Sequence, residues 1–282
     1  MARGQRRRED GRSREGGSAA LLLVMWVFVV TFFFLFAPQI AASFKAFDAV
    51  ASQEQAYLDH IARQLETYYQ RNAGAIDAAV TFSIAPAALW AQLGIDPKPT
   101  LQLGISDRQT GAQVRFRRFV VWLRRGSPDA SAFTVSTGAF APGPNVAYRV
   151  VDGEAVQGAL LEETLTRMKR FAAQLERRFL AKFEADPFRS LSVNHFRALG
   201  PSCTASLDDL PCINVHADVA TAANFATLLS IDPATLSTAW GPRFTVSNLQ
   251  DSQTASPPFT MAIRAPLPWG GTVLVNAIQP LN

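Results

Sequence analysis

An uncharged apolar stretch near the beginning of the chain limits what the protein can fold into more than any other feature. From Ala19 to Ala37 the sequence reads AALLLVMWVFVVTFFFLFA, 19 residues in which Thr31 is the only polar side chain. A helix rises about 1.5 Å per residue, so one of this length crosses a hydrocarbon core of roughly 30 Å. We therefore predict a membrane-spanning helix over residues 19–41, with the lipid bilayer as its partner.

The charges on either side of this stretch indicate its orientation. Residues 1–18 form a basic leader with six arginines, whereas only Lys45 follows closely on the other side. Because positively charged flanks stay in the cytoplasm, we expect a cytoplasmic N-terminus and an extracytoplasmic main body. The alternative is a cleaved secretory signal that ends near Ala41 and Ala42. The length of the apolar run and Ile40 in the cleavage motif favour a retained anchor.

The leader also accounts for most of the formal net charge of +4. Beyond it, basic and acidic residues nearly balance. A nucleic-acid-binding surface normally needs a clear excess of basic residues on the domain that carries it. We therefore expect no nucleic-acid partner.

The stretch VRFRRFVVWLRR alternates apolar and basic side chains, which is typical of a strand with one buried face. The residues expected on the buried face are Val114, Phe116, Val120 and Trp122. Those expected on the opposite face are Arg115, Arg117 and Arg118. A solvated sheet face explains this basic strip better than a surface for acidic partners or lipid phosphates.

Two helices are predicted beyond the apolar stretch. The first continues directly from it, with apolar residues at three-or-four spacing over residues 47–68 and an end near Gly74. Pro38 should kink this helix, because proline removes one backbone hydrogen bond and crowds the preceding turn. The second helix carries an apolar stripe over residues 161–183 and ends before Pro187.

Two later segments, AALWAQLGIDPKPT and NFATLLSIDPATLST, resemble each other, with Ile-Asp-Pro at 95–97 and at 231–233. Each follows a long predicted helix and precedes β-rich sequence, although Asp-Pro is also an ordinary turn signal. The predicted fold class is α+β: a membrane helix that continues as an amphipathic helix, followed by helix-plus-antiparallel-sheet modules. The shared order favours two modules over one, at residues 42–155 and 156–282.

Cys203 and Cys212 are the only cysteines of the chain. In an oxidising compartment, two cysteines at this spacing around a turn favour a disulfide in the second module. A zinc site is the less favoured alternative, because His60, His195 and His216 show no metal-ligand spacing with the cysteines.

No sequence motif indicates an active site. The chain contains no Gly-rich phosphate loop, Cys-x-x-Cys, His-Glu-x-x-His or Gly-x-Ser-x-Gly. His195, His216 and Asp218 could be combined into a catalytic triad, but geometry rather than composition defines a triad. We expect no enzymatic activity, no metal site and no cofactor.

Together these features resemble the type IV pilins and pseudopilins. The likeness rests on a short basic leader that ends in Gly16 and Gly17, a long apolar helix that becomes amphipathic, and a β-rich head. Pro38 lies where such helices often bend. The stretch SIDPATLSTAWGPRFTVSN is similar to the Asp-Pro-Trp-Gly-x-Pro-Tyr pattern of pseudopilins, with Asp232, Pro233, Trp240 and Gly241 at the matching positions.

The resemblance implies that a prepilin peptidase cuts between Gly17 and Ser18 and that the exposed helix packs against copies of itself. Its implied partners are other pilin-like or assembly-machinery subunits of a type IV pilus, conjugative pilus or type II secretion pseudopilus. The implied location is the bacterial inner membrane, with a periplasmic main domain, or a filament.

Two departures favour a minor or tip-like pilin, or a pilus-assembly component that only looks like a pilin. Leu22 stands where the family has a glutamate that pairs with a neighbour's N-terminus, and a second module is not usual in a pilin. The alternative is a bitopic inner-membrane scaffold of a secretion or conjugation machine that is never processed or polymerised.

Overall fold

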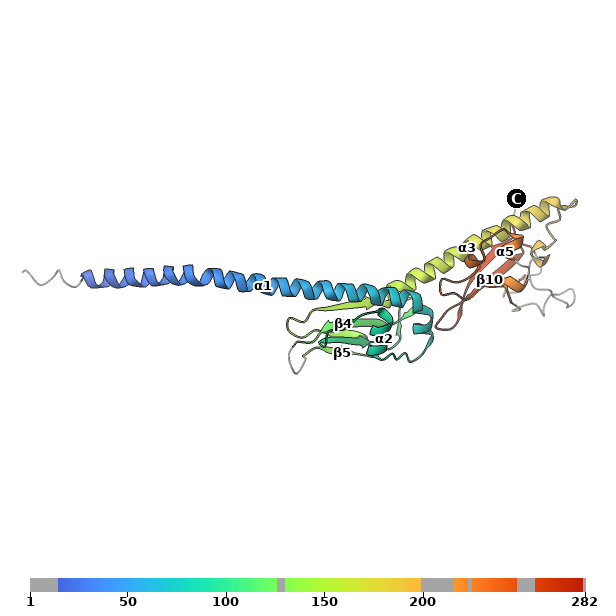
Figure 1. The fold of residues 1–282 in the computed structure, drawn as a ribbon. Helices are drawn as coiled ribbons and strands as arrows, with labels where there is room; N and C mark the ends of the chain where they lie inside the picture. Colours follow the sequence, from blue (N-terminus) through green and yellow to red (C-terminus); the bar gives the residue numbers. More distant parts are fainter. Residues whose placement is uncertain (1–14, 126–129, 199–215, 223–224, 248–256, 281–282) are drawn as a thin grey trace, which may run out of the picture. The chain divides into compact units, whose positions relative to one another are not determined.

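The computed structural model describes residues 15–125, 130–198, 216–222, 225–247 and 257–280 of the chain (Figure 1). The chain divides into two units, residues 1–57 and 58–282, and each is described by itself. Cys203 and Cys212 lie outside the described residues, so their disulfide stays a prediction. The predicted boundary between modules at residues 155 and 156 also stays a prediction.

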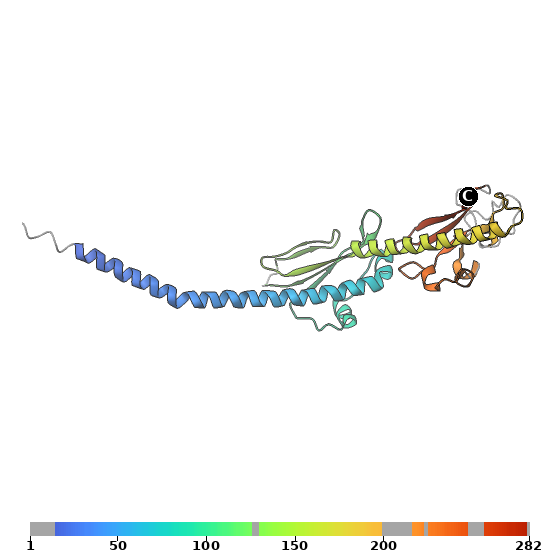
Figure 2. The ribbon, with the colours of Figure 1, turned by 90° about the horizontal axis from the view of Figure 1, so that it is seen from above.

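The first helix, α1 (Glu15–Ala78), is 64 residues long. It runs through Pro38 without interruption, and Figure 2 shows that its blue, N-terminal part bends. A kink at Pro38 itself stays a prediction. The helix also continues past Gly74, where the sequence analysis wrongly placed its end.

Within the first unit, α1 exposes large apolar side chains. The described ones with high exposure are Val50 and, between residues 21 and 36, Leu21, Leu23, Val24, Met25, Trp26, Val27, Phe28, Val29, Phe32, Phe34, Leu35 and Phe36. Among the described residues, no helix is long and apolar enough to cross a membrane.

Within the second unit, the end of α1 covers one face of an antiparallel sheet. This sheet has the order β1 (Leu101–Ile105), β4 (Arg118–Leu123), β7 (Tyr148–Asp152), and the short helix α2 (Pro86–Leu93) precedes it. From α1, the side chains buried at helical spacing are Leu58, Ile61, Leu65, Tyr69 and Ile76. The ring of Tyr69 meets Phe119 of β4 edge-on, at 5.5 Å between centroids.

Two small hairpins complete this part of the chain. They are β2 (Gln109–Thr110) with β3 (Arg115–Phe116), and β5 (Ala132–Thr134) with β6 (Ala139–Ala141). The second hairpin packs on the sheet through aromatic rings, because Phe140 lies 4.9 Å from Trp122 between centroids. The ring of Phe133 occupies the space that a side chain at Gly104 would need.

The long helix α3 (Gly153–Ala185) begins directly after β7. The side chain of Asp152 caps it by accepting a hydrogen bond from Glu154 N at 3.1 Å. Its buried residues include five of the predicted stripe: Leu161, Met168, Ala172, Leu175 and Phe179. The predicted stripe and the predicted end before Pro187 are therefore confirmed.

A second antiparallel sheet packs against α3, as Figure 1 shows for the red strands. Its order is β11 (Thr272–Ile278), β10 (Thr260–Pro266), β9 (Thr245–Ser247), β8 (Ala217–Asp218). The other elements here are η1 (His195–Ala198), α4 (Val219–Ala222), α5 (Phe225–Leu228) and η3 (Pro233–Leu236). Phe171 and Phe179 of α3 join Phe225, Phe244 and Met261 in one core. The described chain is thus α+β with several antiparallel sheets.

The two similar sequence segments adopt the same helix-ending turn. Gly94 after α2 and Ser230 after α5 both have a left-handed backbone, with φ of 64° and 51°. The next amide reaches back five residues in each case, from Ile95 to Trp90 O at 3.0 Å and from Ile231 to Ala226 O at 2.9 Å. The similarity therefore marks a shared way of stopping a short helix, and a common origin of the two modules stays a prediction.

Candidate functional site

Arg117 does not lie on a solvated face, as the alternating pattern predicted. It is 1% exposed, whereas Arg115 is exposed and Arg118 is half-buried. The pattern fails because residue 117 falls between β3 and β4, where the strand is interrupted. There, Arg117 N donates to the Tyr69 hydroxyl at 3.0 Å and Arg117 O accepts from Gly153 N at 3.1 Å. The interruption lets the side chain turn towards the end of α1.

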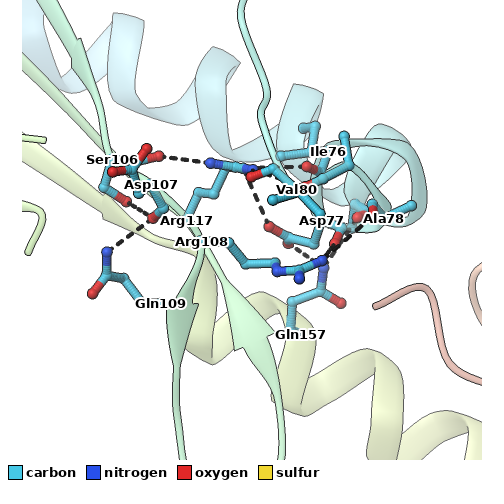
Figure 3. A network of polar contacts seen from close by, with 12 residues as sticks. Ile76, Asp77, Ala78, Val80, Ser106, Asp107, Arg108, Gln109, Arg117 and Gln157 are labelled. Carbon is cyan, nitrogen blue, oxygen red and sulfur yellow. Dashed lines mark hydrogen bonds and ion pairs between the residues drawn. The ribbon is translucent and has the colours of Figure 1, made fainter. Parts of the chain in front are cut away.

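The Arg117 guanidinium closes the C-terminal end of α1 (Figure 3). Its Nε donates to Ile76 O at 3.2 Å, and its Nη2 donates to Ala79 O and Val80 O, each at 2.9 Å. Its Nη1 donates to Ser106 O at 3.0 Å. The last carbonyls of a helix lack partners within the helix and carry partial negative charge. A buried guanidinium here donates hydrogen bonds to these carbonyls and offsets their charge.

Asp77, in the last turn of α1, faces this guanidinium. Its Oδ1 lies 3.9 Å from Arg117 Nε. Its Oδ2 accepts hydrogen bonds from the Tyr69 hydroxyl and from Gln157 Nε2. Tyr69, Asp77, Arg117 and Gln157 are all buried, and we call them the Asp77 network. Because all four are buried, the network fixes the geometry where α1, β4 and α3 meet and presents no group to solvent.

The burial of this network changes the ionisation of its members. Burial raises the pKa of Asp77, and the hydrogen bonds from Tyr69 and Gln157 and the charge of Arg117 oppose that rise. Burial and the nearby Asp77 charge raise the pKa of Tyr69. Burial lowers the pKa of Arg117, against the attraction of Asp77. A paired, hydrogen-bonded arrangement is what makes such a buried charge tolerable.

The structure brings one of the pilin-like turn residues to this network. Trp240 Nε1 donates to Gln157 Oε1 at 2.7 Å, and Gly241 follows with a left-handed φ of 109°. Asp232 and Pro233 lie at the preceding turn, where the Asp232 side chain accepts from Ala234 N at 2.9 Å and Pro233 begins η3. The four residues therefore form two successive turns, of which the second contacts the Asp77 network.

The predicted processing residues, Gly17 and Ser18, lie within α1. Their side chains are outside the description, as is that of Pro38. The cut between Gly17 and Ser18 consequently stays a prediction.

Two of the residues considered for a catalytic triad, His195 and Asp218, make packing and capping contacts. His195 packs edge-on against Phe179, at 5.2 Å between ring centroids. Asp218 accepts a hydrogen bond from Ala220 N at 2.8 Å and lies 3.7 Å from Arg243 Nη1. Where the structure describes the chain, no group of three or more His, Cys, Asp or Glu residues is arranged to hold a metal ion.

Sequence reasoning missed the Asp77 network, although its residues left a signal. Tyr69 lies four residues after Leu65 and Asp77 eight residues after Tyr69, so both continue the buried stripe of α1. Gln157 lies four residues before Leu161, on the buried stripe of α3. A polar residue in phase with an apolar stripe indicates a buried polar contact, since such positions are desolvated on folding.

Comparisons of the chain with protein-family models, with curated proteins and with solved structures give no match. The class of protein is therefore argued from the chain's own features. These are the exposed apolar part of α1, its buried continuation under the first sheet, and the second sheet on α3.

Proposed function

We propose that this protein is a structural, non-catalytic, membrane-anchored subunit of the pilin-like class, in a type IV pilus, conjugative pilus or type II secretion pseudopilus. The observation that carries the proposal is the change of character along α1. Its first part is apolar on all sides and exposed, with Phe28 at 75% and Phe34 at 80%. Its last part is buried in the folded body, through side chains such as Leu58 and Leu65.

An exposed helix of this kind is stable only when lipid or other helices surround it. Burying one large apolar side chain contributes about 1.5–3 kcal/mol, and α1 exposes twelve of them between Leu21 and Phe36. The whole uncharged stretch of the sequence, Ala19–Ala37, includes further apolar residues whose side chains are outside the description. This composition supports anchorage in a bilayer and packing against neighbouring subunits.

The proposed topology follows from the flanking charges. The arginines of the leader stay in the cytoplasm, and residues 58–282 lie in the periplasm of a bacterial cell. In this arrangement the membrane helix continues without interruption into the helix that Arg117 closes. The anchor and the first sheet are thus joined by regular helix rather than by a loop.

Two observations favour the second candidate, an unprocessed bitopic scaffold of a secretion or conjugation machine. Leu22 stands where the pilin pattern has an assembly glutamate. The second sheet has its own long helix, α3, so the body is larger than one helix with one sheet. Both candidates share the anchor and differ in processing and polymerisation.

The mature N-terminus and the fractionation of the protein distinguish the candidates. Intact-mass spectrometry should find a chain that begins at Ser18, and sheared filaments should contain it. A chain that begins at Met1 or Ala2 and stays in membranes identifies the scaffold instead. A chain that begins near Ala42 or Ser43 in the soluble periplasmic fraction contradicts both candidates, because the apolar stretch would then be a cleaved signal.

A further inference from the structure

In the second unit, the end of α1 and the segment that leads to β9 both contact Gln157, near the start of α3. We propose that the hydrogen bond from Trp240 to Gln157 locks both sheets into one cooperative unit, so that the β8–β11 sheet neither swings nor opens independently of the end of α1. The inference concerns the folded body alone and does not depend on the proposed function.

Gln157 uses both of its N–H donors and its carbonyl oxygen at this junction. Its Nε2 donates to Ala73 O at 3.1 Å and to Asp77 Oδ2 at 2.5 Å, both in α1. Its Oε1 accepts from Trp240 Nε1 at 2.7 Å, in the segment that leads to β9. The buried side-chain amide of Gln157, on α3, therefore links α1 to the segment that leads into the second sheet.

Apolar side chains pack around this bridge, and the two tryptophans among them are partly buried. Trp240 Cβ lies 3.5 Å from the position that a Cβ on Gly74 would take, so the indole packs directly on α1. Trp269, at the turn between β10 and β11, meets Trp240 edge-on at 5.5 Å between centroids. Both tryptophans pack against Val114 and Phe116, from the β2–β3 hairpin, and Leu161, from α3.

A backbone contact fixes the same segment a second time. Ala239 N donates to the Thr164 hydroxyl at 3.0 Å, and Thr164 is buried in α3. If the second sheet moved away, Gln157 Oε1 and Thr164 Oγ1 would each lose a protein donor. Detachment of the sheet therefore breaks two hydrogen bonds together with the apolar contacts.

Hydrogen exchange of the full chain in lipid nanodiscs, followed by mass spectrometry over a urea series, tests the lock. In the wild type, the slowest amides of β4 and of β10 should exchange through the same opening, with the same urea dependence. Trp240→Phe keeps an aromatic ring and removes the indole N–H. It should lower the protection of β10 and β11 by about tenfold more than that of β1 and β4, because the second sheet can then open alone.

Leu175→Ala is the matched control, because Leu175 is buried in the core of α3 and the second sheet, away from the Asp77 network. It weakens the second sheet without touching the bridge, so protection should fall equally in β4 and β10. Equal losses in both sheets for Trp240→Phe would overturn the proposal. Unequal losses for Leu175→Ala, or different urea dependences of β4 and β10 in the wild type, would overturn it as well.

Discussion

At the scale of single residues, Arg117 and Asp77 decide how α1 ends. The helix has no basic residue in its own last turn, so the cation that satisfies its carbonyls comes from the strand region between β3 and β4. Arginine suits this position because its planar fork offers five donors in fixed directions, and four of them are engaged here.

Arg117→Lys should therefore be strongly destabilising although it keeps the charge. One ammonium group cannot reach carbonyls on several sides, so buried acceptors and Asp77 lose their partner. We expect a loss of about 3–5 kcal/mol in the free energy of unfolding, measured by urea denaturation in detergent micelles. Arg115→Lys, at the exposed neighbour, should change stability by less than about 0.5 kcal/mol. Equal effects of the two substitutions would contradict the capping role.

The raised pKa of Asp77 predicts a pH dependence. The folded state holds the Asp77 proton more tightly than the unfolded state, so its contribution to stability is fully present below the ordinary value of 3.8 and is lost as the pH rises through the folded pKa. Relative to Asp77→Asn, the wild type should gain stability as the pH falls from neutral towards 3.8. Urea denaturation of both proteins across this range measures the difference. A difference that stays flat or falls with acidification would contradict the raised pKa.

The burial of Arg117 could not be predicted from the sequence. The alternation along VRFRRF predicted that all three arginines lie on one solvated face. Arg115 is exposed as predicted, Arg118 is half-buried, and Arg117 is buried. The break at residue 117 depends on the Tyr69 hydroxyl, which lies 48 residues earlier and replaces a strand partner. A pattern within one strand contains no information about such a distant contact.

At the scale of elements, the buried stripes were predictable and the junctions were not. The stripe of α3 and its end at Pro187 follow from helical spacing and from proline, both local properties. By contrast, α1 continues past Gly74 to Ala78, where Arg117 from a distant strand region satisfies its carbonyls, which is a tertiary effect. The start of α3 is set in the same way, by the space around Gly153.

Gly153→Ala should disrupt the start of α3. A Cβ there would lie 2.3 Å from the Tyr69 hydroxyl and 2.4 Å from Arg117 O, and the second of these is backbone that cannot easily move. Overpacking of this kind costs about 1–3 kcal/mol, measurable as a lower urea midpoint. Gly158→Ala is the matched control in the same helix, where the added methyl group meets nothing within 4 Å. It should be neutral or stabilising by up to about 1 kcal/mol.

At the scale of the whole molecule, α1 has an exposed apolar part near residues 21–36 and a buried part from Leu58 to Ile76. The sequence was sufficient to predict the apolar part, because 19 uncharged residues are a local signal. It was also sufficient for the α+β class. It was not sufficient for the burial that joins α1, α3 and the two sheets through Asp77, Gln157 and Trp240, since those residues are far apart in the chain.

Protease digestion of intact cells and of spheroplasts tests the proposed anchorage most directly. Epitope tags at the N-terminus and after residue 280 would report the two sides of the membrane. We expect the protease to remove residues 58–282 in spheroplasts but not in intact cells, with the N-terminal tag of the unprocessed chain protected in both. Protection of both tags in spheroplasts, or recovery of the intact chain in the soluble cytoplasmic fraction, would contradict a membrane anchor with an exported body.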